Sequence, residues 1–211
     1  MRNLLLISFI TIMAQLACAQ GIKITDKASI ATLRSELAQA YSEIETMQCQ
    51  YQQEKTIALL EDNIKTQGVV IYHNPRKLYW SMKDDYDHYF AMCDDNIKIV
   101  NANGETTMPI NNHPIFREIA KMVIAGEKRG DLIDDNNFYS ELYEYKDTFV
   151  VQMKPKKNRM KAMFGIMTLI FDKETKIMKC IEMTETSGDK TTITLHEVVI
   201  NQKCDNSMFT F

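Results

Sequence analysis

The feature that most constrains the fold of this chain is an alternation of apolar and polar residues, repeated in one short segment after another. In residues 77–83, for example, Leu78, Trp80 and Met82 share one side of an extended strand, with lysines and a serine on the other. A period of two residues is that of a β-strand with one buried face. Short runs rich in Asn, Asp, Gly and Pro, which are typical of turns, separate these segments. The predicted strands are 48–60, 65–73, 77–83, 87–93, 97–101, 105–110, 137–145, 148–154, 165–172, 176–184 and 190–201.

Strands this closely spaced predict an antiparallel sheet, because parallel strands need long crossover connections. A sheet that is apolar on one face needs a cover, and two segments have the period of a covering α-helix. In the first, apolar residues recur every three or four positions from Ile30 to Met47. Asp26 or Ser29 is placed to cap its start. A second amphipathic helix is predicted after Pro114.

The N-terminus has the organisation of a secretory signal peptide. Arg2 supplies a positive charge, an apolar run follows, and Ala17-Cys18-Ala19 supplies the small residues of a cleavage site. The apolar run is shorter than the ~20 residues that a membrane-spanning helix needs. We expect residues 1–19 to be removed after Ala19, which leaves a single periplasmic domain over residues 20–211. The alternative is lipidation of Cys18, which would anchor the protein to a membrane.

Composition and motifs exclude several classes of protein. A balance of 25 basic and 28 acidic residues argues against a protein that binds nucleic acid. Cys49, Cys93, Cys180 and Cys204 are too few for a disulfide scaffold, and the sequence does not choose among their three complete pairings. Neither a nucleophile elbow, nor a phosphate-binding glycine loop, nor a zinc-protease motif is present. We therefore expect no enzymatic activity, cofactor or metal.

Methionine is frequent, with 14 residues in the chain. Its flexible side chain fills irregular cores and also re-packs around variable partners. A curved sheet beneath two helices can enclose an apolar cavity, although periodicity alone does not distinguish a cavity from a solid core. The residues predicted to line such a cavity are Tyr51, Val69, Ile71, Leu78, Trp80, Met82, Tyr89, Ile115, Ile119, Met122, Val123, Phe149, Val151 and Met153.

Positive charge is concentrated in one segment, residues 154–161, which contains no acidic residue. Two interpretations are open: a contact with phospholipid headgroups or an acidic partner, and a solvated loop. The basic residues are Lys154, Lys156, Lys157, Arg159 and Lys161.

Several strings, in their order along the chain, resemble the LolA family of periplasmic outer-membrane lipoprotein carrier proteins. The resemblance extends from about Leu33 to Phe211. The strings that carry it are Cys49 to Gln53, Gly68 to Trp80, Asp94 to Ile97, Phe149 to Lys156, Ile177 to Gly188 and Phe209 to Phe211.

The resemblance implies a mainly β fold with two helices, in which a half-open, strongly curved antiparallel β-barrel is covered by helices on its concave face. It implies a monomer whose cavity holds the acyl chains of a lipoprotein. The cargo would come from an inner-membrane exporter and pass to an outer-membrane acceptor or membrane. In the family an Arg before the conserved Pro holds the covering lid. Here Asn74 occupies that place and Arg76 follows the Pro, and the sequence does not decide which replaces it. The alternative is a membrane-anchored acceptor or lipid-sensing module of the same fold.

Overall fold

The computed structural model describes residues 21–59, 63–83, 88–110, 133, 135–162 and 164–211, and most of these residues lie in β-strands. The strands are β1 (Ile22–Ile24), β2 (Thr46–Thr56), β3 (Asn63–His73), β4 (Lys77–Met82), β5 (Tyr89–Cys93), β6 (Asn96–Asn101), β7 (Gly104–Pro109), β8 (Phe138–Glu144), β9 (Thr148–Pro155), β10 (Ile166–Asp172), β11 (Met178–Thr184) and β12 (Lys190–Ile200). The helices are α1 (Lys27–Ser42), the one-turn α3 (Asn158–Lys161) and the 3₁₀ turn η2 (Ser207–Phe209).

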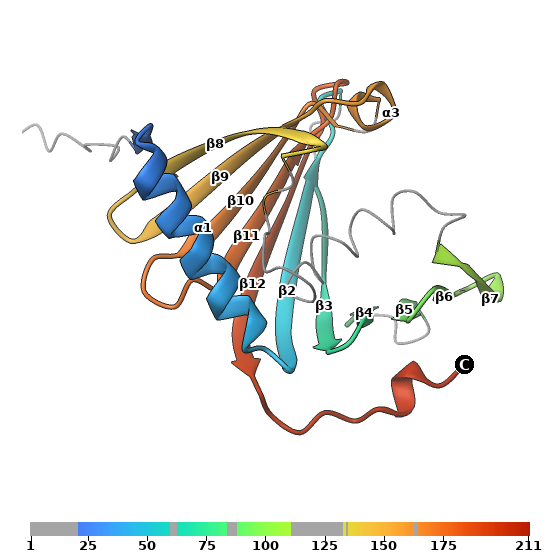
Figure 1. Cartoon of the computed structure of the whole chain (residues 1–211). Coiled ribbons are helices and arrows are strands. Elements are labelled where there is room, and N and C mark those ends of the chain that lie inside the picture. The colour runs from blue at the N-terminus through green and yellow to red at the C-terminus, as the bar shows by residue number, and fades with distance from the viewer. Residues whose placement is uncertain (1–20, 60–62, 84–87, 111–132, 134, 163) are drawn as a thin grey trace, which may run out of the picture.

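The strands form one sheet in the order β1-β8-β9-β10-β11-β12-β2-β3-β4-β5-β6-β7, in which every neighbouring pair is antiparallel. Figure 1 shows that β8 to β3 fan out from the end near α3, whereas β4 to β7 turn away from them. The sheet is therefore strongly curved. Its edges are β1 and β7, and within the described residues no pairing closes it. The prediction of a curved, antiparallel, mainly β fold is confirmed.

Each of the eleven predicted strands corresponds to an observed one, because turn residues interrupt the alternation clearly. The predicted strand 48–60 is too long, since β2 ends at Thr56. The short strand β1, which pairs with β8, was missed. Three residues are too few to reveal a period, and β1 is positioned by its partner strand.

The first helix begins where the sequence predicts and ends earlier. Asp26 caps α1, and its carboxylate accepts a hydrogen bond of 2.8 Å from the Ser29 N–H. The helix ends at Ser42, so the predicted extent to Met47 is wrong. Ile44 and Met47 continue the apolar spacing because they also face the core, but from the connection to β2 and from β2 itself.

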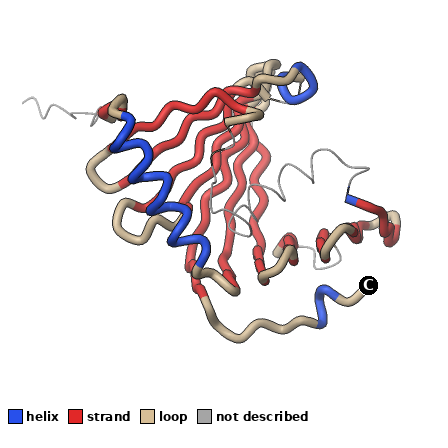
Figure 2. Tube along the Cα trace, in the orientation of Figure 1, coloured by secondary structure: helices blue, strands red, loops and turns tan. Residues whose placement is uncertain are grey.

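One long helix lies across the sheet in the described part of the chain (Figure 2). The predicted second helix, with Ile115, Ile119, Met122 and Val123, falls outside the described residues. The expectation that two long helices cover the sheet is therefore not met: α1 is the single long helix of the described chain.

The core lies between α1 and the sheet face beneath it, which we call the inner face. Leu33, Leu37 and Tyr41 form the buried side of α1. The Tyr41 ring meets Phe171 of β10 edge to face at 6.4 Å, and its hydroxyl accepts a 2.9 Å hydrogen bond from the Met178 N–H. Burying each large apolar side chain stabilises the fold by about 1.5–3 kcal/mol, which favours a fixed position for α1.

Candidate apolar binding site

The inner face carries continuous apolar rows that can be followed from strand to strand. Residues directly opposite each other in an antiparallel pair share a face of the sheet. One row joins Leu142, Val151, Leu169, Ile181 and Ile193 from β8 to β12. All five belong to the core or pack against it. The inner face of these strands is thus apolar across five neighbouring strands.

A second inner-face row consists of methionines. Met153, Met167 and Met183 lie opposite one another on β9, β10 and β11. The first two are buried and Met183 is half-buried. Ser140, opposite Met153 on β8, has a buried hydroxyl without a hydrogen-bond partner. This wall is therefore adaptable in shape, because methionine changes rotamer at little cost.

Aromatic rings continue the inner face across β2, β4 and β5. The ring centroids of Tyr51 and Trp80 are 4.6 Å apart, and Phe90 stacks on Trp80 at 6.0 Å. Trp80 and Phe90 are only half-buried. Burial raises the pKa of Tyr51, although a hydrogen bond with Trp80 opposes the shift. A Cβ at Gly68 would lie 2.8 Å from the Tyr51 ring, so glycine allows the ring to lie over β3.

The structure divides the predicted cavity residues between the two faces of the sheet. From the strand register, seven of them share the inner face: Tyr51, Leu78, Trp80, Met82, Phe149, Val151 and Met153. Val69, Ile71 and Tyr89 do not lie with them, because they alternate with inner-face residues and belong to the outer face. The expectation of one common lining is therefore wrong for these three.

The error has a physical cause in β3 and β5, which are apolar on both faces. On the outer face of β3 and β4, the C-terminal Phe209 is buried, with its ring 6.4 Å from that of His73. Lys77 lies over the same ring at 5.8 Å. The outer apolar residues are therefore not evidence for the cavity. Sequence reasoning missed the following inner-face residues, which only the register reveals: Val70, Tyr72, Phe90, Met92, Met167, Leu169, Phe171, Ile181 and Met183.

Cavities open at both ends of α1. Near its C-terminal end, a cavity of about 470 Å³ is lined by Ile44 of the connection to β2, Ile177 and Met178 of the β10–β11 hairpin, and Leu195 of β12. A second cavity of about 550 Å³ lies near the N-terminal half, between α1, β1 and Phe149. The apolar surface beside each end of α1 is therefore accessible from outside, whereas Leu33, Leu37 and Tyr41 pack the middle of the helix against the sheet.

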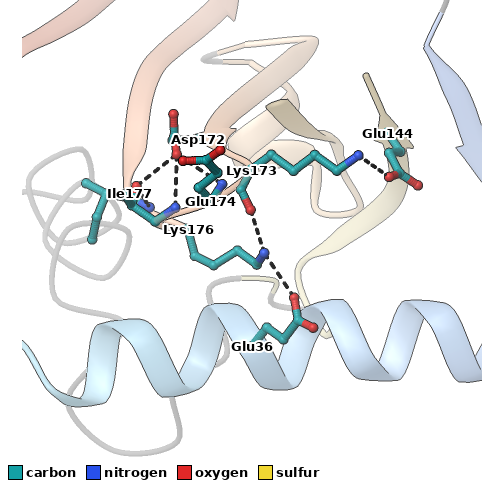
Figure 3. Close-up of polar contacts among 8 residues, drawn as sticks. Glu36, Glu144, Asp172, Lys173, Glu174, Lys176 and Ile177 are labelled. Carbon is teal, nitrogen blue, oxygen red and sulfur yellow. Dashed lines mark hydrogen bonds and ion pairs between the residues drawn. The ribbon is translucent and has the colours of Figure 1, made fainter. Parts of the chain in front are cut away.

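Ion pairs attach α1 to the sheet and its connections. The Lys176 ammonium, at the turn between β10 and β11, lies 3.2 Å from the Glu36 carboxylate and donates to the Lys173 carbonyl at 2.6 Å (Figure 3). Lys173 in turn lies 2.5 Å from Glu144 of β8. On the other side, Arg34 donates to the Ile133 carbonyl at 2.6 Å. These contacts lie at the edge of the covered region, so they can open without exposing the core.

The turn that presents Lys176 is organised by Asp172. Its carboxylate accepts hydrogen bonds from the backbone N–H groups of Thr175 at 2.9 Å and Glu174 at 3.1 Å. These hydrogen bonds hold the pKa of Asp172 at about 2, below its ordinary value of 3.8, mainly through the Thr175 N–H. Lys176 itself has a φ of 61°, a left-handed conformation that is costly for a non-glycine residue. The turn is therefore shaped to direct this lysine toward α1.

Phe149 of β9 lies beneath both lysines of this turn. The ammonium groups of Lys176 and Lys173 lie 5.0 Å and 5.6 Å from the centroid of its ring. The ring is 8% exposed and lines the cavity at the N-terminal half of α1. The mouth of that cavity is therefore an aromatic surface beside two cations, although both cations are already paired with carboxylates.

The basic segment is surface-exposed, and its members have different surroundings. Lys156 donates to the Asp135 carbonyl at 2.5 Å and lies 4.7 Å above the Tyr139 ring. Lys154, Lys157 and Lys161 are exposed. The side chain of Arg159 is outside the described part of the structure.

Neither a metal site nor a membrane-spanning helix is found in the described ranges. No group of three or more His, Cys, Asp or Glu side chains is placed there to hold a metal ion. No helix in these ranges is both long and apolar enough to cross a membrane.

Residues 42–211 match the family described as outer membrane lipoprotein carrier protein LolA. The chain belongs to the LolA family. The match begins at the last residue of α1, so the helix that covers the inner face is known from the structure and not from the match. Membership of the LolA family indicates an extracytoplasmic protein that binds lipoproteins or lipids. The fold of this family is that of binding proteins and carriers and not of an enzyme family.

Solved structures of similar fold have very different sequences. An uncharacterized conserved protein from Thermus thermophilus is 7% identical, with a TM-score of 0.53 over 87% of this chain and 94% of that one. A chain of the MucA/MucB complex of Pseudomonas aeruginosa is 8% identical, with a TM-score of 0.50 over 87% of this chain and 61% of that one. A LolA superfamily protein from Nitrosomonas europaea is 6% identical, with a TM-score of 0.45 over 86% and 97%. None of the curated proteins matches in sequence.

Within the described residues of this LolA-family chain, Arg76 pairs with Asp95 and not with the covering helix α1. The Arg76 guanidinium lies 2.5 Å from the Asp95 carboxylate, at the turn between β5 and β6. The Asn74 N–H donates to the Glu45 carbonyl at 2.7 Å, beside the start of β2. In the described part of this structure, Arg34 and Lys176 supply the cationic contacts to and from α1 instead.

Proposed function

We propose that this protein is a carrier that binds the acyl chains of lipoproteins, or of a related lipid, against the inner face of its sheet. The observation that carries the proposal is the continuous apolar inner face, with its methionine row and half-buried aromatic rings, which α1 covers only in part and beside which a cavity lies at each end of the helix. Desolvation of an acyl chain provides about 0.8 kcal/mol for each buried CH₂, so a chain of ordinary length binds without any polar recognition.

Release requires α1 to move, and its polar contacts suit that requirement. The partly exposed pair of Lys176 and Glu36 contributes at most about 1 kcal/mol, as is usual for such ion pairs. Leu33, Leu37 and Tyr41 also hold α1 through buried contacts, so in this proposal their repacking accompanies the opening of the edge contacts. No bond is made or broken in this cycle, and the work is done by exposure and burial of apolar surface.

The wider role in this proposal follows the family. After removal of residues 1–19, the monomer would receive cargo from an inner-membrane exporter and deliver it to an outer-membrane acceptor or membrane. A half-open barrel belongs to the same proposal.

Two neighbouring positions on β4 test the proposal. Trp80 belongs to the inner face and Tyr79 to the outer face, and both are half-buried. Trp80→Ser should lower the affinity for a fluorescent fatty-acid probe by about tenfold, since it removes one aromatic wall of the site. Tyr79→Ser is the matched control and should retain affinity at a comparable unfolding temperature. Equal affinity in the two variants would contradict binding at the inner face.

A second candidate function is a membrane-anchored acceptor or lipid-sensing module. The fold it shares with a chain of the MucA/MucB complex favours this candidate, because that fold is there part of a protein–protein complex. The mass of the mature protein distinguishes the two candidates. Acylation at Cys18 supports an anchored module, whereas an unmodified chain that begins at Gln20 supports the carrier.

A further inference from the structure

We propose that the end of the sheet that carries α3 docks on the surface of an anionic lipid bilayer. We call this surface the α3 end and define it by Lys154, Lys157, Lys161, Tyr139, Ile166 and Leu59. The inference depends on the proposed carrier function only for its biological setting, in which docking brings the cavity close to the membrane that supplies or accepts acyl chains.

The members of the α3 end come from separate strands that terminate together. Tyr139 pairs with Lys154, and Ile166 begins the next strand, β10. Lys190 at the start of β12 pairs with Thr56 at the end of β2. Figure 1 shows these strand ends gathered beside α3. The surface therefore spans several strands at one end of the molecule, opposite the turn between β8 and β9.

The lysines of α3 point outward because its other side is fixed in the core. Met160 is buried, and Phe164, just beyond the helix, stacks on Phe138 at 6.2 Å. Lys157 is the extended residue that precedes α3 and Lys161 is its last residue, and the Lys161 N–H donates to the Lys157 carbonyl at 3.0 Å, so the two lie one turn apart. Both are exposed and have no ion-pair partner within the described residues.

Lysines outnumber the carboxylates near the α3 end, which leaves the local charge positive. Glu141 is paired with Lys23 and also interacts electrostatically with Lys154, and Glu185 lies 3.1 Å from Lys55. The Asp189 carboxylate accepts a 2.9 Å hydrogen bond from the Ala58 N–H and keeps its negative charge. The chain as a whole carries a net charge of −3, so attraction to an anionic surface must come from this end and would orient the molecule.

Apolar and aromatic side chains are exposed among these lysines. Leu59 is 95% exposed, next to the Ala58–Asp189 contact, and Tyr139 is 64% exposed. Ile166 is 36% exposed beside Lys154. Single exposed apolar residues are common, but their combination with tyrosine and unpaired lysines at one end is that of an interfacial contact. Separate exposed apolar side chains can insert between lipid headgroups, whereas a stable interface with a protein needs a continuous, closely packed apolar patch.

Vesicle co-sedimentation tests the proposal with the purified protein. The protein should bind vesicles of phosphatidylcholine and phosphatidylglycerol, and it should bind vesicles of phosphatidylcholine alone much more weakly. Lys157→Gln with Lys161→Gln should lower the affinity for the anionic vesicles about 25-fold, from about fivefold for each lysine near the surface. Added salt should weaken binding of the unchanged protein, because the attraction is screened.

A second double variant provides the matched control. Lys146 and Lys203 are exposed lysines of the β8–β9 turn and the C-terminal segment, outside the α3 end. Lys146→Gln with Lys203→Gln removes the same charge and should leave vesicle binding unchanged. Equal binding by the two double variants, or equal binding of the unchanged protein to neutral and anionic vesicles, would overturn the proposal. Capture of an acidic protein in place of vesicles would also overturn it.

The fatty-acid probe separates docking from cargo binding. The variant of Lys157 and Lys161 should bind the probe as tightly as the unchanged protein while it loses vesicle binding, which supports docking as a separate property. If no protein binds the probe but vesicle binding still depends on these lysines, the proposed carrier function fails and the docking surface stands.

Discussion

Lys176, in the turn between β10 and β11, reaches across to α1 and forms an ion pair of 3.2 Å with Glu36. The side chain of Lys176 is 18% exposed and that of Glu36 is 47% exposed. The pair therefore joins the covering helix to the sheet at a place that water reaches from one side. The ion pair is thus a contact between the covering helix and the sheet, whereas Arg76 pairs with Asp95.

Loss of this ion pair should speed release more than it lowers stability. Lys176→Gln is expected to raise the dissociation rate of a bound fatty-acid probe about two- to fivefold, and to lower the free energy of unfolding by less than about 1 kcal/mol. Stopped-flow dilution and urea unfolding measure the two quantities. Lys98→Gln is the control, because Lys98 is similarly exposed and pairs with Glu105 between β6 and β7, not with α1. A release rate that is the same in both variants would show that Lys176 does not hold the cover.

Acid should destabilise the protein partly through Asp172. Its pKa of about 2 lies below the ordinary 3.8, so its stabilising contribution is complete above about pH 4 and is lost as the pH falls toward about 2. Asp172→Asn should be less stable than the unchanged protein at neutral pH, and the difference should disappear near pH 2. Urea unfolding at a series of pH values measures this. A difference that stays constant from pH 7 to pH 2 would contradict the assignment.

Gly68 should be intolerant of any side chain, because β3 and β4 approach closely there. A Cβ at this position would lie 1.8 Å from the Ser81 carbonyl oxygen. Gly68→Ala is expected to lower the free energy of unfolding by about 1–3 kcal/mol or more, since backbone must shift to accept the methyl group. Gly165→Ala is the control, as its Cβ would meet only the Thr184 oxygen at 3.7 Å. Equal stability of the two variants would refute this packing.

Cys49 should be the least reactive of the four thiols described. It is 1% exposed on the inner face, and burial raises its pKa to about 12. Because the thiolate is the reactive form, iodoacetamide at pH 8 should modify the half-buried Cys93, Cys180 and Cys204 well before Cys49. Peptide mass spectrometry after timed labelling checks the order, and labelling in urea shows that Cys49 is competent once exposed. Early modification of Cys49 would mean that α1 leaves the sheet readily.

The strands and the start of α1 were predictable because their determinants are local. Alternation between turn residues gives strand positions, and Asp26 followed by Ser29 identifies the cap of α1. The end of α1 was not predictable, since Ile44 and Met47 keep the helical spacing while they reach the core from other elements. β1 was missed because its position depends on pairing with β8.

For the candidate site as well, local sequence patterns predicted some features, and the others depended on the tertiary structure. Trp80 and Met153 share the inner face with the other apolar residues at alternate positions of their strands, although whether they line a cavity for cargo stays a prediction. Val69 and Ile71 were assigned to the same lining, but β3 is apolar on both sides and its register decides which residues face inward. A shift of one residue exchanges the faces, and no pattern within such a strand fixes it.

By itself, the sequence determined a mainly β, antiparallel fold, the family, and a supply of apolar and methionine side chains, because periodicity and turn chemistry act over a few residues. The tertiary structure decided which side of each strand faces α1, that Lys176 pairs with Glu36 of α1 whereas Arg76 pairs with Asp95, and which lysines of the basic segment have no ion-pair partner in the described structure. Those properties depend on strand register and on contacts between residues far apart in the chain, such as Glu36 and Lys176. They arise only when the sheet curves and the helix lies on it.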